Sequence, residues 1–181
     1  MIITTIDAIK ELYRHWKGEF PDSVDVLPQS GSDRRYFRLH GKDKTVIATH
    51  GINLKENETF IYFSQHFQEK AIPGANILSV NEDKSIYLQE DFGDVSLLNI
   101  LEAEGFTDRV YDLFANSLKA LAMLQVRGDE GLDYNQCLTN KEFGKQAILS
   151  DLLYFKYYFL DTLKIPYDKE KLIEDFDALS H

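Results

Sequence analysis

The stretch Ile86-Tyr87-Leu88-Gln89-Glu90-Asp91-Phe92-Gly93-Asp94 divides the chain into two parts of different character. It begins as an apolar strand, turns abruptly acidic and then reaches a glycine. Short β-like runs separated by turns precede it, whereas only long helical patterns follow it. A strand that leaves a β-rich half and enters an all-helical half marks a junction between two lobes, and such clefts commonly bind small ligands.

The overall composition restricts the class of protein. The chain has 181 residues, 44% of them hydrophobic and 28% charged, which is typical of a soluble globular protein. Its net charge of −10 argues against a general nucleic-acid surface, because phosphate binding requires a concentrated positive field. We find no apolar run long enough for a membrane span and no basic-then-apolar leader. The single Cys137 excludes an internal disulfide and a cysteine-cluster metal site, so we expect a cytoplasmic protein.

The first half predicts an antiparallel sheet of about five strands with two helices. Thr4 is expected to cap a helix that extends to Lys17, with Asp7 in its first turn. Alternating apolar residues and turn chemistry then predict the remaining elements, which are strands at 24–27, 35–39 and 45–49, a helix at 57–70, and strands at 77–80 and 85–89.

The second half predicts helices only. Thr107 caps a helix that extends to about Gln125, and Thr139 with Glu142 forms a capping-box pattern for a helix that reaches about Lys164. That helix carries a dense apolar band at 152–159, and a last helix continues to the end of the chain without a stop signal. We therefore expect the chain to be the N-terminal part of a longer protein, with bare apolar faces that favour self-association.

The turn between the first two strands is the strongest candidate for ligand binding. Ser30, Gly31, Ser32 and Asp33 are turn residues whose backbone N–H groups can surround an anion. Arginines follow at once in this acidic chain, and guanidinium groups match phosphate oxygens in bidentate geometry. They occupy positions 34, 35 and 38. A plain hairpin with solvated arginines is an equally good interpretation of the turn by itself.

Three stretches together resemble one enzyme family. The stretch Leu27-Pro28-Gln29-Ser30-Gly31-Ser32-Asp33-Arg34-Arg35-Tyr36-Phe37-Arg38-Leu39 resembles the first hairpin of the aminoglycoside-phosphotransferase-like small-molecule kinases. The branch it resembles most phosphorylates N-acetylmuramate or N-acetylglucosamine at the anomeric position. Tyr87-Leu88-Gln89-Glu90-Asp91-Phe92-Gly93-Asp94 resembles the strand and hinge of that branch, and Leu118-Lys119-Ala120-Leu121-Ala122-Met123-Leu124-Gln125 resembles its first long helix. The resemblance covers most of 27–159.

The resemblance implies a kinase-like fold, with a small lobe at 1–92 that covers ATP and the first helices of a helical lobe at 93–181. The turn from Ser30 to Arg35 would lie over the nucleotide phosphates, and Glu90, Asp91 and Phe92 would line the adenine. Phosphoryl transfer depends mostly on positioning and charge neutralisation, so both parts have a clear role.

The chain departs from the family pattern at two places. Relatives carry a lysine on the third strand that pairs with a helix glutamate, whereas this strand ends at His50 without a lysine. His50, Arg34 or Arg35 is then the candidate cation, and Glu56 or Glu58 is its candidate partner.

The catalytic loop and the magnesium-binding aspartate of the family are also absent. We expect the magnesium ligands beyond the chain end and assign no catalytic or metal-binding residue here. Asp91-Phe92-Gly93 spells the magnesium-binding triplet of protein kinases, but no His-Arg-Asp loop precedes it, so we interpret it as a linker.

The sequence thus predicts the N-terminal portion of an ATP-dependent phosphotransferase for a sugar or amino sugar, inactive as the chain stands. Its partners would be a nucleotide and, through the missing lobe, the substrate. One alternative is a non-catalytic kinase-like module that binds a nucleotide or a protein. Another is a kinase for a different small molecule, such as choline, an aminoglycoside or a fructosamine.

Overall fold

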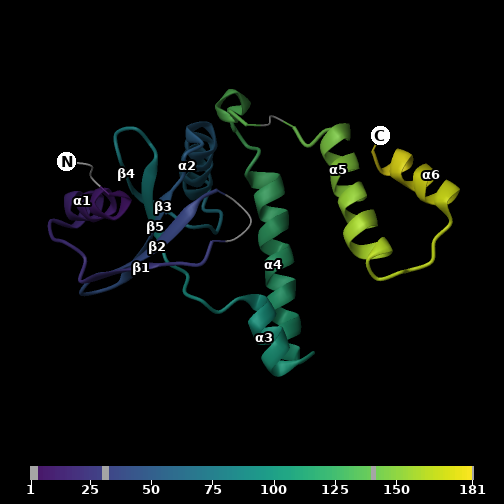
Figure 1. Cartoon of the computed structure of the whole chain (residues 1–181), viewed down its shortest axis with the longest axis horizontal. Helices are drawn as coiled ribbons and strands as arrows, with labels where there is room; N and C mark the ends of the chain where they lie inside the picture. Colours follow the sequence, from purple (N-terminus) through teal and green to yellow (C-terminus); the bar gives the residue numbers. More distant parts are fainter. Residues whose placement is uncertain (1–3, 30–32, 140–141, 181) are drawn as a thin grey trace. The chain divides into compact units, whose positions relative to one another are not determined.

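The computed structural model of the chain describes residues 4–29, 33–139 and 142–180. The chain folds as two compact units, Met1–Thr139 and Asn140–His181. The first unit contains α1 (Thr5–Lys17), β1 (Ser23–Val26), β2 (Arg35–His40), β3 (Thr45–His50), α2 (Leu54–Glu69), β4 (Ile77–Val80), β5 (Ile86–Glu90), α3 (Leu97–Glu104), α4 (Asp108–Arg127) and the 3-10 turn η1 (Tyr134–Gln136). The second contains α5 (Lys145–Phe155), the π-helical η2 (Lys156–Asp161) and α6 (Lys169–Leu179) (Figure 1).

The five strands form one antiparallel sheet in the order β1-β2-β3-β5-β4. Every predicted strand is present within one residue of its predicted bounds at each end. No strand follows β5 in the described part of the chain, so the predicted change from strands to helices is also confirmed. The predicted lobe boundary after residue 92 lies inside the first compact unit, because α3, α4 and η1 belong to the same unit as the sheet.

The sheet has two faces with different cover. Along β2, β3 and β5 the side chains alternate between the faces. One face packs against α1 and forms the main core, which consists of Ile9, Leu12, Tyr13, Phe37, Leu39, Val46, Ala48, Ile86 and Leu88. The other face carries Tyr36, Thr49 and Tyr87 in one row across the strands. The ring of Phe60 from α2 stacks on Tyr87 with a centroid distance of 5.4 Å, so α1 and α2 cover opposite faces (Figure 1).

The N-terminal helix follows its predicted signals closely. The Thr4 hydroxyl accepts a hydrogen bond from the Asp7 N–H, and the Asp7 carboxylate accepts one from the Thr4 N–H. Gly18 ends the helix at a φ of 83°, a left-handed conformation that glycine adopts without steric cost. The predicted cap and length of this helix are confirmed.

Two predicted helix starts are wrong. Helix α2 begins three residues early, because Asn53 caps it by accepting from the Glu56 N–H at 3.3 Å. Helix α5 begins at Lys145 rather than after Thr139, and Glu142 precedes it in a non-helical conformation. Gly144 explains this second difference, since glycine is unfavourable in a helix interior and stands here at the N-cap instead.

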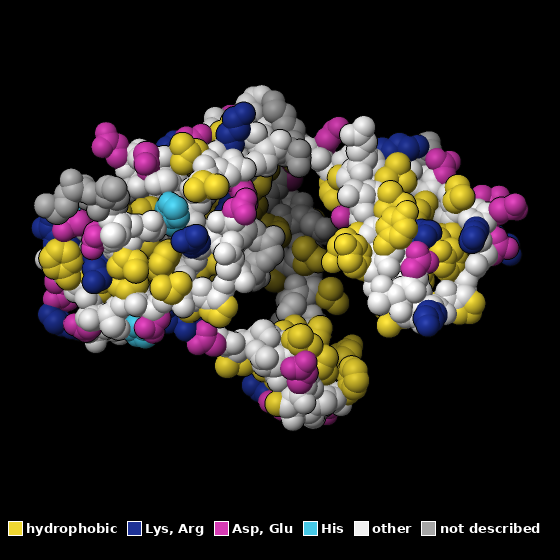
Figure 2. Space-filling model, viewed as in Figure 1, with side chains coloured by type: hydrophobic (Ala, Val, Ile, Leu, Met, Phe, Trp, Pro, Cys, Tyr) yellow, Lys and Arg dark blue, Asp and Glu magenta, His cyan; other side chains and the backbone are white. Residues whose placement is uncertain are grey.

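The first helix of the second unit changes from an α-helix to a π-helix before it ends. The predicted single helix to Lys164 is α-helical only to Phe155, and six residues of π-helix follow. Lys164 then adopts a φ of 53°, which ends the segment. Only Leu160, Phe176 and Ser180 are buried among the described residues of this unit. Hydrophobic side chains therefore gather on its surface over α5 (Figure 2).

In the described part of the chain, no helix has both the length and the apolar character that crossing a membrane requires.

Candidate functional site

Arg34 lies immediately before β2 and points toward α2. Its Nη2 atom is 3.0 Å from Glu56 Oε1 and also donates to the Glu56 carbonyl oxygen at 3.4 Å. The guanidinium carbon lies 5.4 Å from the centroid of the Phe60 ring. Glu56 and Phe60 are one helical turn apart, so α2 holds this arginine by an ion pair and a cation–π contact from one face.

One donor atom of Arg34 has no hydrogen-bond partner among the described residues. The Arg34 side chain is 15% exposed, and this atom, Nε, is buried. Buried donors are usually paired, so an unpaired one needs an explanation. Arg34 also acts on Tyr87 beneath it: burial raises the pKa of Tyr87 to about 12, although the nearby guanidinium opposes that rise.

The side chains of the other residues that could replace the missing strand lysine, or pair with its replacement, do not lie beside Arg34 and Glu56. His50 is the direct strand partner of Arg35, and alternation places both on the sheet face that α1 covers. Thr49, which is fully buried, occupies the end of β3 on the α2 side instead. Glu58 pairs with Lys84 at 3.0 Å rather than with an arginine. Of the five predicted residues, only Arg34 and Glu56 form the expected ion pair of a cation with a helix glutamate in the described part of the chain.

The third arginine of the cluster has a different partner. Arg38 donates from Nε to Asp91 Oδ2 at 2.7 Å and from Nη2 to Asp91 Oδ1 at 3.0 Å. A further bond runs from Nη1 to Asp94 Oδ2 at 2.7 Å. Arg38 therefore neutralises the linker after β5, and it is not available for the phosphate role that the arginine cluster suggested.

Burial and hydrogen bonding act in opposite directions on Asp91. Burial alone would raise the pKa of its carboxyl group, but hydrogen bonds from Arg38, Thr45 and the Gly93 N–H lower it overall. The ion pairs with Asp94 and Asp91 raise the pKa of Arg38 in turn. Since the Asp91 carboxylate accepts these bonds within the protein, it is held as a linker anchor.

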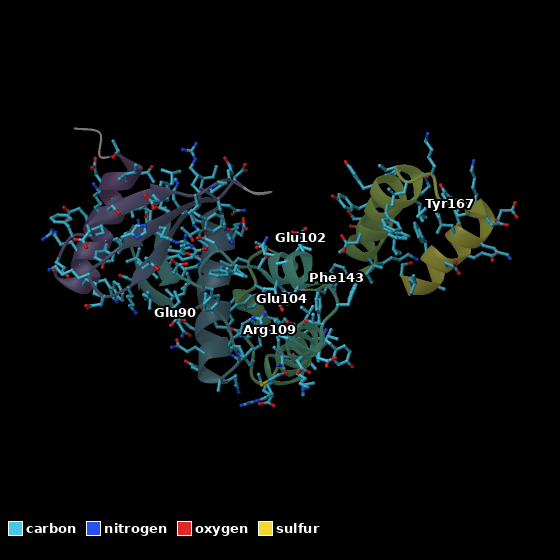
Figure 3. All side chains as sticks on the ribbon, turned by 90° about the horizontal axis from the view of Figure 1, so that it is seen from below. Glu90, Glu102, Glu104, Arg109, Phe143 and Tyr167 are labelled. Atoms are coloured by element: carbon cyan, nitrogen blue, oxygen red, sulfur yellow. The ribbon has the colours of Figure 1, made fainter. Side chains whose placement is uncertain are left out.

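The predicted adenine-lining residues form one end of the sheet. Glu90 accepts from the Asn76 backbone N–H at 3.1 Å and from Asn76 Nδ2 at 2.9 Å, and Figure 3 marks its place. Phe92 is 74% exposed. An open hollow of about 380 Å³ lies beside the linker and is lined by Lys44, Thr45, Val46, Glu90, Asp91 and Phe92.

Only the C-terminal part of the predicted phosphate-binding turn lies within the described residues. Ser30, Gly31 and Ser32 lie outside the described residues. Asp33 is exposed and lines a small pocket of about 250 Å³ together with Arg34, Gly51, Ile52, Asn53, Glu56 and Asn57. This pocket lies at the N-terminal end of α2, where backbone N–H groups favour negative charge.

The sequence analysis missed Asn57, which fixes the start of α2 against the sheet. This residue is fully buried, and its Nδ2 atom donates to the carbonyl oxygens of Gly51 and Lys84, both at 2.9 Å. A Cβ at Gly51 would collide with Asn57 Oδ1, so glycine is needed there. The available signal was an asparagine in the first turns of a helix, close to a glycine that follows a strand.

Comparison with known proteins does not identify a relative: no family model matches the chain, and no curated protein is significantly similar to it. Among the described residues, no group of three or more histidine, cysteine, aspartate or glutamate side chains is arranged to hold a metal ion.

Proposed function

We propose that this chain supplies the nucleotide-binding part of a kinase-like, ATP-dependent phosphotransferase that acts on a sugar or amino sugar. The observation that carries this proposal is the partly buried Arg34, which Glu56 and Phe60 hold beside the predicted phosphate turn. An arginine in this position replaces the absent strand lysine and keeps the pairing with a helix glutamate. The α+β fold, with an antiparallel sheet that leads into helices, is compatible with this function.

The proposal gives ATP a defined set of contacts. Arg34 and the backbone of the turn before it would bind the phosphates, and the linker from Glu90 to Phe92 would contact the adenine. Magnesium, when bound together with ATP, would supply positive charge that offsets the charge of the phosphates. Because Asp91 is occupied by Arg38, we assign no magnesium ligand within this chain.

The test compares two adjacent arginines with a distant one. A hydrogen bond between charged groups is worth roughly 1.5–3 kcal/mol, so Arg34→Ala should weaken ATP binding about tenfold or more. Arg35→Ala should bind ATP like the wild type, because Arg35 is exposed on the other sheet face. Arg109→Ala is the second control, since Arg109 pairs with Glu104 at the junction of α3 and α4 (Figure 3).

Calorimetric titration of ATP into the wild type and the three variants gives the answer directly. If Arg34→Ala binds ATP as tightly as Arg35→Ala and Arg109→Ala do, the turn is an ordinary hairpin and the proposal loses its main support.

A further inference from the structure

One side of α2 is hydrogen-bonded to the segment that follows α4. The Thr59 hydroxyl donates to the Gln136 carbonyl oxygen at 3.3 Å and accepts from the Leu138 N–H at 2.9 Å. The Tyr62 hydroxyl accepts from the Asp133 N–H at 2.7 Å. His66 Nε2 lies 2.8 Å from the Gly128 carbonyl oxygen, which can only accept, so this nitrogen donates.

These three residues form a regular pattern on the helix. Positions 59, 62 and 66 are separated by three and four residues, and therefore lie on one face of α2. Their partners are backbone groups at the beginning, middle and end of 128–138, which we call the strap. Thr59 and His66 are 7% exposed, so water competes little for these bonds.

Close packing supports the same attachment. A Cβ at Gly128 would collide with the Leu124 carbonyl oxygen and press on the Phe67 ring of α2. Glycine therefore allows the strap to approach the helix where His66 binds it. Lys70 extends the contact by one more turn, with its Nζ atom 3.9 Å from Glu130 Oε2.

The strap and the arginine site use the same stretch of helix. Glu56, which binds Arg34, precedes Thr59 by three residues, so the two side chains are one turn apart. A shift of α2 that separates Thr59 from the strap would also move Glu56. Asn57 attaches the start of α2 to the sheet, and the strap attaches the same helix one turn later, so both attachments lie close to the Arg34–Glu56 pair.

We propose that Thr59, Tyr62 and His66 are positioning residues through which the strap holds α2, and with it Glu56, in the place that Arg34 requires. The effect of the strap on ATP rests on the proposed function, whereas the mechanical coupling of strap and helix does not. Substitutions on this face of α2, which do not touch the nucleotide, should accordingly weaken ATP binding through Arg34.

The central experiment removes one hydroxyl without changing the volume of the side chain. Thr59→Val loses both hydrogen bonds to the strap, and Thr59→Ser keeps the hydroxyl. Ser64→Ala is the matched control, because Ser64 lies on the same helix and donates to the Ala75 carbonyl oxygen at 2.6 Å, outside the strap. Tyr62→Phe is a milder second variant that removes only the acceptor for the Asp133 N–H.

Hydrogen exchange measures the coupling without any ligand. Loss of two hydrogen bonds in Thr59→Val should accelerate amide exchange about fivefold to tenfold both in the strap and in the first turns of α2. Tyr62→Phe should act in the same direction and more weakly, whereas Thr59→Ser and Ser64→Ala should leave the strap amides unchanged. Unchanged exchange in both segments of Thr59→Val and Tyr62→Phe would overturn the coupling.

A double-mutant cycle with ATP separates positioning from general destabilisation. Thr59→Val should weaken ATP binding about fivefold in the wild-type background and have no further effect in Arg34→Ala, because the strap acts through Arg34. An equal loss in both backgrounds would overturn the positioning role. If the wild type itself binds no ATP, the proposed function and the ATP role of the strap fail together, and the exchange result alone decides whether the strap holds α2.

Discussion

Arg38 determines the geometry of the linker after β5 because a single guanidinium holds two of its carboxylates. The Asp91 side chain is 4% exposed and that of Arg38 is 13% exposed, so both charged groups are largely shielded from water. Breaking a buried ion pair leaves the remaining charge without compensation, which is strongly destabilising. We expect Asp91→Asn to lower the free energy of unfolding by about 3 kcal/mol, measured by urea denaturation at pH 7.

The neighbouring aspartate provides the matched control for this prediction. Asp94 binds the same guanidinium, but its side chain is 77% exposed. Exposed ion pairs contribute little, so Asp94→Asn should cost about 1 kcal/mol or less. Equal effects of the two substitutions would contradict the assignment of Asp91 as the buried anchor.

The pH dependence of the same variants provides a second check. The pKa of Asp91 is lower in the folded protein than its ordinary value of 3.8. Its contribution to stability is therefore present above that value and is lost as the pH falls through the folded-state pKa. The difference in unfolding free energy between wild type and Asp91→Asn should thus shrink below about pH 4.

At the residue scale, the sequence offers several candidate ion pairs but does not decide which of them form. A cluster of arginines after a Ser-Gly turn indicated anion binding, and Arg34 with Glu56 matches one of the pairings expected. The role of Arg38 was not predictable from local pattern, because its partner Asp91 lies 53 residues away along the chain. Strand alternation shows only that Arg35 and Arg38 point to opposite faces of the sheet. The register between neighbouring strands decides which side chains each arginine contacts.

At the element scale, the predicted strands and the cap of α1 are confirmed because their signals are local. Thr4 and Asp7 satisfy each other across one helical turn, and no distant residue is needed. The predicted start of α5 was wrong because the capping pattern of Thr139 and Glu142 took no account of Gly144. Gly144 would have stood inside the predicted helix, where glycine is unfavourable. Nothing in the local sequence distinguished α-helix from π-helix at 156–161.

Asn57 provides a test of how α2 is attached to the sheet. Its amide donates two hydrogen bonds to carbonyl oxygens, so an aspartate there would place a buried carboxylate against two acceptors. We expect Asn57→Asp to lower the free energy of unfolding by about 3 kcal/mol or more at pH 7, measured by urea denaturation.

The same substitution four residues earlier is its control. Asn53 is exposed and caps α2 through its side-chain oxygen, a role that aspartate performs equally well. Asn53→Asp should therefore change the unfolding free energy by less than about 0.5 kcal/mol. If Asn57→Asp is as mild as Asn53→Asp, the clamp between Gly51 and Lys84 does not hold the helix.

At the scale of the whole molecule, the two compact units differ in how much apolar surface they bury. The sheet and α1 form a closed core in the first unit, whereas most large hydrophobic residues of the second unit are exposed. The composition predicted a soluble globular chain with enough apolar residues for a core. It does not show which of these residues are buried in the folded protein. An amphipathic pattern identifies a helix face, and only the tertiary contacts show whether a neighbour packs on it.

This exposed surface leads to the last prediction, which concerns association of the chain with itself. Stacked rings lie along α5 and η2: Tyr154 on Tyr158 at 4.3 Å, and Phe155 on Phe159 at 5.3 Å. All four are more than 40% exposed, and Figure 2 shows hydrophobic side chains concentrated over this region. Because contiguous apolar patches drive association, we expect light scattering to show a mass that rises with protein concentration. The double substitution Tyr154→Glu with Tyr158→Glu should abolish that rise, whereas Phe106→Glu, at a residue of the first unit that is 97% exposed, should not. A constant monomer mass for the wild type, or an equal effect of the Phe106 control, would show that the aromatic surface does not mediate association.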